Sequence, residues 1–225
     1  MKNFIKKEGL GYQSIKLRDT IKTKGHDRSE LIKKAFPKTL KNKSLLDVGC
    51  YLGYFCLEAS KRGAKEVKGL DVDPEKIRNA KKIAEIKRRK IKFEIKDIEL
   101  LEETKAYDYV LCLNLLHHLN EPIKVINKLI NITKDTLILE IATLGTHDYR
   151  KLSISKRFAK EFSKKPLIYV NKGVLPTNRG GNQKYFFSEE SIRRILSEHK
   201  KLFSEIKIIN SDFKTRKIII AKKEK

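Results

Sequence analysis

The sequence has few cysteines and no long apolar run. Its three cysteines, Cys50, Cys56 and Cys112, lack the spacing of metal ligands and fall in segments predicted for the core. We therefore expect no metal site, and reduced buried thiols as in a cytoplasmic protein. No apolar stretch approaches the ~20 residues of a membrane span. The Lys-rich N-terminus also lacks the continuous apolar segment of a signal peptide.

Acidic residues are scarce relative to basic ones. The chain has 28 Asp and Glu against 52 Lys and Arg, which gives a formal net charge of +24. Such a charge favours a polyanionic partner, such as RNA, DNA, a nucleotide-linked metabolite or an anionic membrane. The lysines are nevertheless spread along the whole chain, and a Lys/Glu-rich proteome gives a similar bias. Both interpretations stay open at this point.

What the sequence does contain is an apolar segment followed by a glycine loop. Residues 45–48 include Asp47, and Gly49 and Gly53 follow. This order predicts a strand, a tight turn and the start of a helix, the layout of a nucleotide-binding unit. Glycine at 49 lets the backbone turn sharply and approach a ligand. Tyr51 stands where the dinucleotide fingerprint has its middle glycine.

Three more predicted strands follow, and each ends in a polar residue. Residues 67–71 end in Asp71, residues 91–97 in Asp97, and residues 107–114 in Asn114. Asp71 comes roughly twenty residues after the loop, the spacing expected of a ribose-binding carboxylate. Asp73, before Pro74, is better interpreted as a helix cap.

The remaining elements follow from periodicity and from cap and turn residues. Helices are predicted at 29–36, 54–62, 74–87, 122–131, 151–164 and 188–203. Further strands are predicted at 44–48, 136–142, 205–210 and 216–221, the last two as an antiparallel pair.

This series resembles the class I S-adenosylmethionine (SAM)-dependent methyltransferases over residues 43–142. A narrower resemblance lies in residues 12–17 and 23–27, the aromatic Tyr51 and the segment 115–122. These are similar to the group of tRNA wobble-uridine 5-oxyacetate methyl- and carboxymethyltransferases. The resemblance implies the enzyme class, and the narrower group includes enzymes that act on tRNA.

The resemblance implies an α/β, three-layer Rossmann-like fold. Its sheet is mostly parallel and seven-stranded, with an antiparallel last strand. We expect a basic N-terminal arm and helix at 1–40 and a methyltransferase domain at 41–225. A lid or substrate insertion is expected after strand five, at 143–185.

The resemblance also assigns residues to the cofactor SAM. Asp47 is expected near the amino group of its methionine moiety, and Asp71 on the ribose hydroxyls. Asp97 and the Ile98 amide are expected at the adenine, and the carbonyl of Asn114 near the sulfonium. Gly49 and Gly53 allow close approach, whereas Tyr51 either lines the pocket or packs under the loop.

The acceptor is constrained mainly by what is missing. There is no Asn/Asp-Pro-Pro-Tyr/Phe tetrad and no Pro-Cys or Thr-Cys nucleophile, which argues against amino-group chemistry on bases and against C5-cytosine chemistry. His118 and His117 are the candidate acid–base pair, although either could only shape the pocket. An anionic acceptor could be oriented by basic residues of the insertion: Arg150, Arg157, Lys172 or Arg179.

We therefore predict methyl transfer from SAM to a hydroxyl, or another small nucleophile, of a small-molecule or nucleotide-linked acceptor. The alternative is a tRNA methyltransferase, which could use carboxy-SAM. A third hypothesis is a SAM-binding subunit without chemistry of its own.

Overall fold

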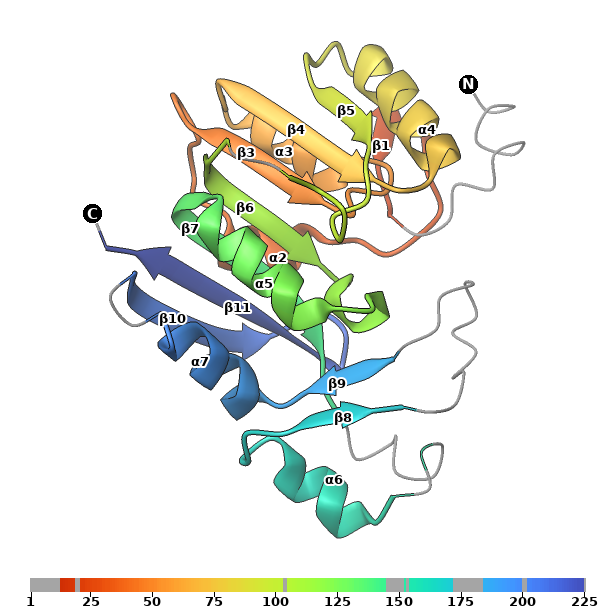
Figure 1. Ribbon diagram of the computed structural model, residues 1–225. Helices are drawn as coiled ribbons and strands as arrows, with labels where there is room; N and C mark the ends of the chain where they lie inside the picture. The colour runs from red at the N-terminus through yellow and green to blue at the C-terminus, as the bar shows by residue number, and fades with distance from the viewer. Residues whose placement is uncertain are drawn as a thin grey trace. The chain divides into compact units, whose positions relative to one another are not determined.

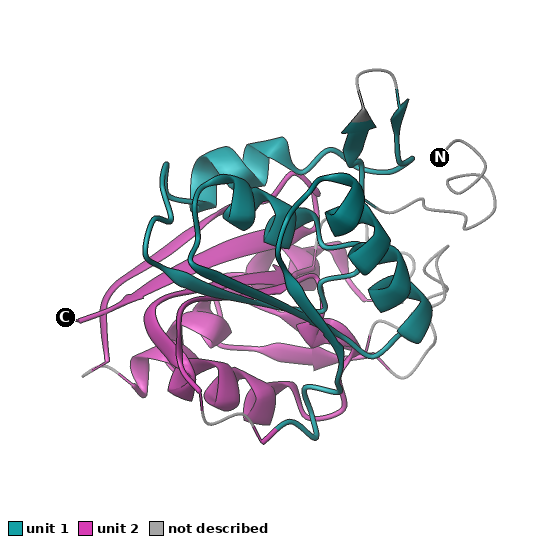
Figure 2. Cartoon of the chain, turned by 90° about the horizontal axis from the view of Figure 1, so that it is seen from above, with its two compact units in different colours: residues 1–101 teal, residues 102–225 magenta. Residues whose placement is uncertain are grey.

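The computed structural model describes residues 13–18, 21–102, 105–144, 152, 154–171, 184–199 and 202–224 (Figure 1). The chain divides into two compact units, Met1–Leu101 and Glu102–Lys225 (Figure 2). The boundaries expected from the sequence, 1–40 and 41–225, concern domains and stay a prediction.

Unit 1 contains a parallel sheet, three described helices and a short antiparallel hairpin. The hairpin strands are β1 (Lys16–Arg18) and β2 (Ile21–Lys22), and the sheet strands are β3 (Ser44–Val48), β4 (Glu66–Asp71) and β5 (Lys92–Ile95). The helices are α2 (Ser29–Ala35), α3 (Tyr54–Lys61) and α4 (Pro74–Ile86).

The register of the parallel strands brings the predicted site residues to one edge. Val48 pairs with Leu70, and Asp71 pairs with Ile95. Since parallel strands point the same way, their carboxyl ends meet at this edge, where ligands of open α/β sheets bind. The loops that follow β3, β4 and β5 carry Tyr51, Asp73 and Asp97.

Helix α4 is favoured both by the capping residues at its start and by an apolar face along its length. Asp73 accepts hydrogen bonds from the amides of Glu75 and Lys76, and Pro74 occupies the first helical position. Ile77, Ala80 and Ile83 lie on one face and are buried. The prediction of a capped helix beginning at Pro74 is confirmed.

Unit 2 contains the other four strands of the large sheet, two helices beside them, and the insertion. The strands are β6 (Tyr107–Leu113), β7 (Thr133–Ala142), β10 (Phe203–Asn210) and β11 (Arg216–Lys223). The helices are α5 (Pro122–Asn131) and α7 (Glu189–Ser197), and a short 3-10 turn, η1, spans Leu116–His118. The insertion contains α6 (Lys156–Phe162), β8 (Ile168–Val170) and β9 (Tyr185–Phe187).

The strand topology confirms the predicted fold class. Strand β6 runs parallel to β7, and β11 is antiparallel both to β7 and to β10. The seven-stranded sheet has the order β10-β11-β7-β6-β3-β4-β5. It is therefore a mostly parallel sheet whose last strand is antiparallel, as the sequence predicts.

The insertion after β7 has a small core of its own. Leu152, Phe162 and Phe186 are buried together with Ala142 and Leu144. Strands β8 and β9 form an antiparallel pair, which lies beside α6 in Figure 1. The sequence does not predict this pair, and the helix expected at 151–164 is described at Lys156–Phe162.

Two further features bear on the sequence predictions. All three cysteines are buried and free of disulfide bonds. No helix within the described ranges combines the length and the apolar character needed to cross a membrane.

Candidate active site

The glycine loop after β3 is held in a left-handed conformation. Gly49, Tyr51 and Gly53 have φ angles of 74°, 53° and 76°. The amides of Gly49 and Cys50 donate to the carbonyl of Leu70, at 2.8 and 2.9 Å. Glycine adopts these angles without cost, whereas tyrosine does not. Tyr51 therefore has a strained backbone, which the surrounding contacts must hold.

The position of Gly53 is required by packing within unit 1. A Cβ at this position would lie 2.7 Å from Cζ of Phe93, on β5. Gly69, on β4, is constrained by the same ring, because its Cβ would lie 2.7 Å from Cδ1 of Phe93. The sequence predicts that Gly53 allows close approach, but it gives no indication that Phe93 is the residue that needs the space.

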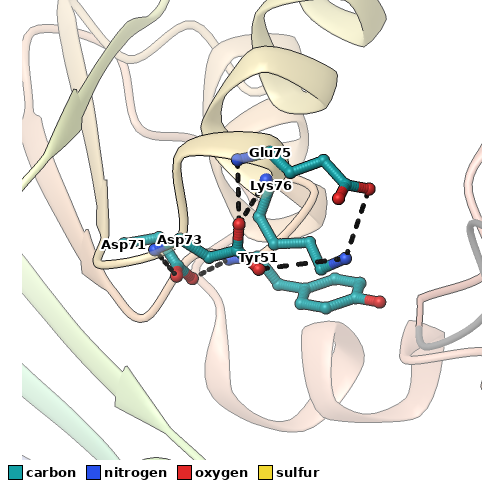
Figure 3. A network of polar contacts seen from close by, with 5 residues as sticks. All are labelled: Tyr51, Asp71, Asp73, Glu75 and Lys76. Atoms are coloured by element: carbon teal, nitrogen blue, oxygen red, sulfur yellow. Dashed lines mark hydrogen bonds and ion pairs between the residues drawn. The ribbon is translucent and has the colours of Figure 1, made fainter. Parts of the chain in front are cut away.

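Asp71 joins the end of β4 to the glycine loop. Its Oδ2 accepts a hydrogen bond from the amide of Tyr51 at 2.9 Å, and its Oδ1 accepts one from the amide of Asp73 at 3.1 Å (Figure 3). Burial raises the pKa of the Asp71 carboxyl, while the two amides lower it. The carboxylate is thus fixed at the edge where the predicted ribose would lie.

Lys76 links the side chain of Tyr51 to the start of α4. Its ammonium lies 5.3 Å from the centre of the Tyr51 ring, within cation–π range. The same Nζ is 4.0 Å from Oδ2 of Asp73 and 3.9 Å from Oε1 of Glu75 (Figure 3). Sequence reasoning missed Lys76, because nothing in the pattern of α4 distinguishes it from the other lysines of this helix.

Asp47 is a buried carboxyl beneath the glycine loop. It is 1% exposed, and the thiol of Cys56 lies 3.5 Å from its Oδ2. Burial raises the pKa of Asp47 to about 7, although the contact with Cys56 acts in the opposite direction. A buried carboxyl of this kind is stabilised in its charged form by a nearby cation, such as an ammonium group.

The residues after β5 occupy a turn. Oδ1 of Asp97 accepts a hydrogen bond from the amide of Glu99 at 2.8 Å, and Ile98 is 4% exposed. One carboxylate oxygen of Asp97 thus stabilises the turn, as an ordinary residue at a strand end would. The adenine contacts of Asp97 and Ile98 stay predictions.

Val72 is an apolar residue that sequence reasoning missed. It directly follows Asp71 and is 60% exposed. A large aliphatic side chain this exposed beside a fixed carboxylate provides an apolar contact surface next to a polar one. Val72 could have been noticed in the sequence, because it is an apolar residue between two aspartates, Asp71 and Asp73.

In unit 2, Asn114 ends β6 in a left-handed conformation, with φ of 58°. Its amide donates to the carbonyl of Glu140 at 3.2 Å, and its Oδ1 accepts from Nε of Arg216 at 2.7 Å. Arg216 begins β11, where the sequence predicts a strand to start, but it was not predicted as a partner of Asn114. Glu140 could have been noticed, because it is the one acidic residue in the buried run 137–142 and is 0% exposed.

The two histidines lie next to each other on η1, but their environments differ. The ring centroids of His117 and His118 are 4.1 Å apart. His117 is fully buried, whereas His118 is half-buried. Burial holds the pKa of His117 well below its ordinary value, and the charge of Arg216 adds to this effect. His117 is therefore a neutral ring near pH 7.

Hydrogen bonds connect the insertion to this histidine turn. The amide of Lys184 donates to the carbonyl of His117 at 2.8 Å, and the hydroxyl of Tyr185 donates to the carbonyl of Asn120 at 3.0 Å. Nζ of Lys184 also donates to Oδ1 of Asn120. The residues beside β9 thus hold η1 within unit 2.

No contact within the described residues joins the predicted acceptor-binding arginines to η1. Arg157 is exposed on α6. Arg179, like Arg150 and Lys172, lies outside the described residues. Substrate binding by Arg157 and Arg179 stays a prediction.

With this geometry in place, the comparisons identify the class of protein. The family model for the methyltransferase domain matches residues 22–199. The chain belongs to this methyltransferase family, and the predicted class of SAM-dependent methyltransferases is confirmed. The N-terminal domain of EvdMO1, solved with S-adenosylhomocysteine bound, has a TM-score of 0.70 and 18% identity, and the match covers 99% of this chain and 95% of that one. At this identity the likeness shows the fold.

Two curated relatives have different acceptors in their names. The tRNA U34 carboxymethyltransferase of Helicobacter pylori is 31% identical over an alignment 138 residues long, which covers 55% of this chain and 52% of that protein. The ubiquinone biosynthesis O-methyltransferase of Coxiella burnetii is 37% identical over 89 residues, 39% of this chain and 38% of that protein. The chain thus spans about half the length of such relatives, or less.

Proposed function

We propose that this methyltransferase acts on a hydroxyl group of a small-molecule or nucleotide-linked acceptor, and that residues of unit 1 hold its SAM. The observation that carries the cofactor assignment is Asp71, a carboxylate fixed by the amides of Tyr51 and Asp73 at the carboxyl end of β4. Its paired oxygens can accept from both hydroxyls of a ribose. SAM, when bound, supplies a methyl group activated on a sulfonium.

The other residues of unit 1 fit the remaining groups of this cofactor. Val72 offers an apolar surface for a purine ring beside the ribose carboxylate. Asp97 and the amide of Ile98 supply an acceptor and a donor for the adenine edge. Asp47 supplies a buried carboxyl for the ammonium group. We assign the carbonyl of Asn114 to the sulfonium end, on the resemblance alone.

The Asp47 assignment predicts that ligand binding depends on pH. In the ligand-free chain, the pKa of Asp47 is about 7, so near pH 6 most of the carboxyl is protonated. A bound ammonium group favours the ionised form, so binding releases a proton and affinity rises with pH. We expect S-adenosylhomocysteine to bind roughly tenfold more tightly at pH 8 than at pH 6. Titration calorimetry in buffers of different ionisation enthalpy measures both the affinity and the proton release.

The control for this experiment is Asp47→Asn, which removes the titrating group but keeps its shape. Its affinity should be almost independent of pH between 6 and 8. An unchanged pH dependence in this variant would show that another group titrates on binding.

On the acceptor side, we assign proton removal to His118. Transfer of a methyl to a hydroxyl requires loss of the hydroxyl proton, and a half-buried imidazole can take it. The neighbouring His117 is too deeply buried to hold a proton near neutral pH, so it acts as a neutral packing partner of His118.

We expect His118→Gln to lower kcat about 10²- to 10⁴-fold, the usual contribution of a general base. The affinity for S-adenosylhomocysteine should stay within twofold, because His118 is not assigned to the cofactor. His117→Gln is the matched variant and should mainly lower thermal stability. An unchanged kcat in His118→Gln would rule out its role as the base.

The second candidate function is methylation of tRNA. It is favoured by the net charge of +24 and by the likeness to a tRNA U34 carboxymethyltransferase. We rank it second because the lysines are spread along the whole chain rather than concentrated in one segment. If the positive charge of the chain binds tRNA phosphates, log K should fall steeply with log salt concentration.

The experiment that separates the candidates uses methyl-labelled SAM with an RNA-free metabolite extract and, separately, with tRNA of the source cells. The proposal predicts label in the RNA-free fraction. Label in a tRNA nucleoside would replace it with the second candidate, and a parallel reaction with carboxy-SAM would test that form of the cofactor. Absence of label in both would favour a binding subunit without chemistry.

A further inference from the structure

The side chain of Gln13 contacts the first residue of α3, although Gln13 is far from this helix in sequence. Its side chain is part of a residue only 4% exposed, and Oε1 accepts a hydrogen bond from the amide of Tyr54 at 3.3 Å, across 41 residues of chain. Tyr54 is the first residue of α3, and the residue before it, Gly53, has no side chain with which to cap the helix. Gln13 therefore supplies the cap that the glycine loop itself lacks.

The backbone around Gln13 is fixed by its own hydrogen bonds. Thr23, which is 0% exposed, donates through Oγ1 to the carbonyl of Gln13 and accepts from the amide of Ile15 at 2.7 Å. The amide of Ser14 donates to the carbonyl of His26 at 3.0 Å. These bonds tie both ends of the segment that contains the β1–β2 hairpin, so Gln13 is held in place before any ligand binds.

The chemistry of the cap sets the orientation of the Gln13 amide. A backbone N–H needs an acceptor, so Oε1 must face Tyr54, and the two N–H groups of Nε2 must point elsewhere. Among the described residues, Nε2 has no hydrogen-bond acceptor. An amide nitrogen beside the positive end of a helix, in a residue that is 4% exposed and with its donors unused, is suited to an anionic ligand.

Resting on the proposed function, we infer that Gln13 donates a hydrogen bond from Nε2 to the carboxylate of the methionine moiety of SAM. This carboxylate is the single anionic group of the cofactor. The assigned ammonium partner, Asp47, is on β3, and Tyr54 follows the same glycine loop, so both ends of the amino-acid group would be held around one loop. The segment before β1 thereby becomes part of the cofactor site.

The test compares two ligands and two variants at pH 8. S-adenosylhomocysteine carries the carboxylate, whereas 5′-methylthioadenosine has the adenosine and the sulfur but lacks the amino-acid group. Gln13→Glu can still cap α3, because a carboxylate accepts from Tyr54 at least as well as an amide does. It cannot donate, and it places a negative charge beside the ligand carboxylate. The control variant Asn42→Asp adds the same charge at an exposed position of unit 1.

We expect Gln13→Glu to weaken S-adenosylhomocysteine binding by about tenfold or more and to leave 5′-methylthioadenosine binding within twofold. The variant should keep a cooperative thermal transition, with a midpoint lowered by the burial of the carboxylate. Asn42→Asp should leave both affinities unchanged. If Gln13→Glu binds S-adenosylhomocysteine like the wild type, or loses affinity for both ligands equally, Gln13 is only a helix cap. A wild-type chain that binds neither ligand would instead overturn the proposed cofactor site, and this inference with it.

Discussion

Asp71→Asn is expected to weaken the binding of S-adenosylhomocysteine by about 10- to 100-fold. A hydrogen bond to a charged group contributes about 1.5–3 kcal/mol, and each 1.4 kcal/mol corresponds to a tenfold change in affinity. The asparagine side chain keeps one acceptor oxygen, but it loses the charge and replaces the second acceptor with a donor. Titration calorimetry with the purified chain measures the effect directly.

Asp73→Asn is the matched control for Asp71→Asn. Asp73 lies two residues later, and its Oδ1 accepts from the amides of Glu75 and Lys76 at the start of α4. Asparagine caps helices about as well as aspartate, so both stability and affinity should be nearly unchanged. If Asp73→Asn loses affinity and Asp71→Asn does not, Asp73 is the ribose ligand.

Gly53→Ala is expected to be the most destabilising single-methyl substitution in unit 1. Its Cβ would lie 2.7 Å from the Phe93 ring, and its φ of 76° is unfavourable for alanine. Left-handed strain costs about 1–2 kcal/mol and overpacking about 1–3 kcal/mol, so we expect a loss of about 2–5 kcal/mol. Chemical denaturation of the ligand-free chain measures this loss without involving the cofactor.

Gly63→Ala separates strain from overpacking. Gly63 has a similar φ of 84°, but the nearest atom to an added Cβ is 3.9 Å away. Only the strain of about 1–2 kcal/mol should remain. In the Gly53→Ala background, Phe93→Leu should recover part of the stability, because it removes the ring edge. Equal losses for the two glycines would show that Phe93 does not constrain Gly53.

The sequence predicted the regular elements well where periodicity, caps and turn residues agreed. Strand β3 and helix α5 have the predicted bounds, and strand β6 begins where predicted. Helix α4 begins where Asp73 and Pro74 indicate, because capping is a local effect that the sequence encodes directly. The short strands β8 and β9 were missed because three residues contain too little alternation to identify a strand.

A site residue was predictable only where its place in a local pattern, such as the end of a strand, marks it. Asp71 could be found from its place at the end of a strand. Gln13 and Arg216 could not, because their partners, Tyr54 and Asn114, are 41 and 102 residues away. No local pattern encodes such pairs. The sequence placed Tyr51 in the glycine loop but left the environment of its ring open. Its contact with Lys76 on α4 is not encoded by any local pattern.

The central claim is that the ribose of the cofactor binds to Asp71. The most direct measurement is a crystal structure of this chain with S-adenosylhomocysteine, read as the distances from the Asp71 carboxylate oxygens to the two ribose hydroxyls. We expect both distances to be within about 3 Å, the usual length of a hydrogen bond. A ribose bound to Asp73 or Asp97, or a ligand that leaves Asp71 without contact, would contradict it.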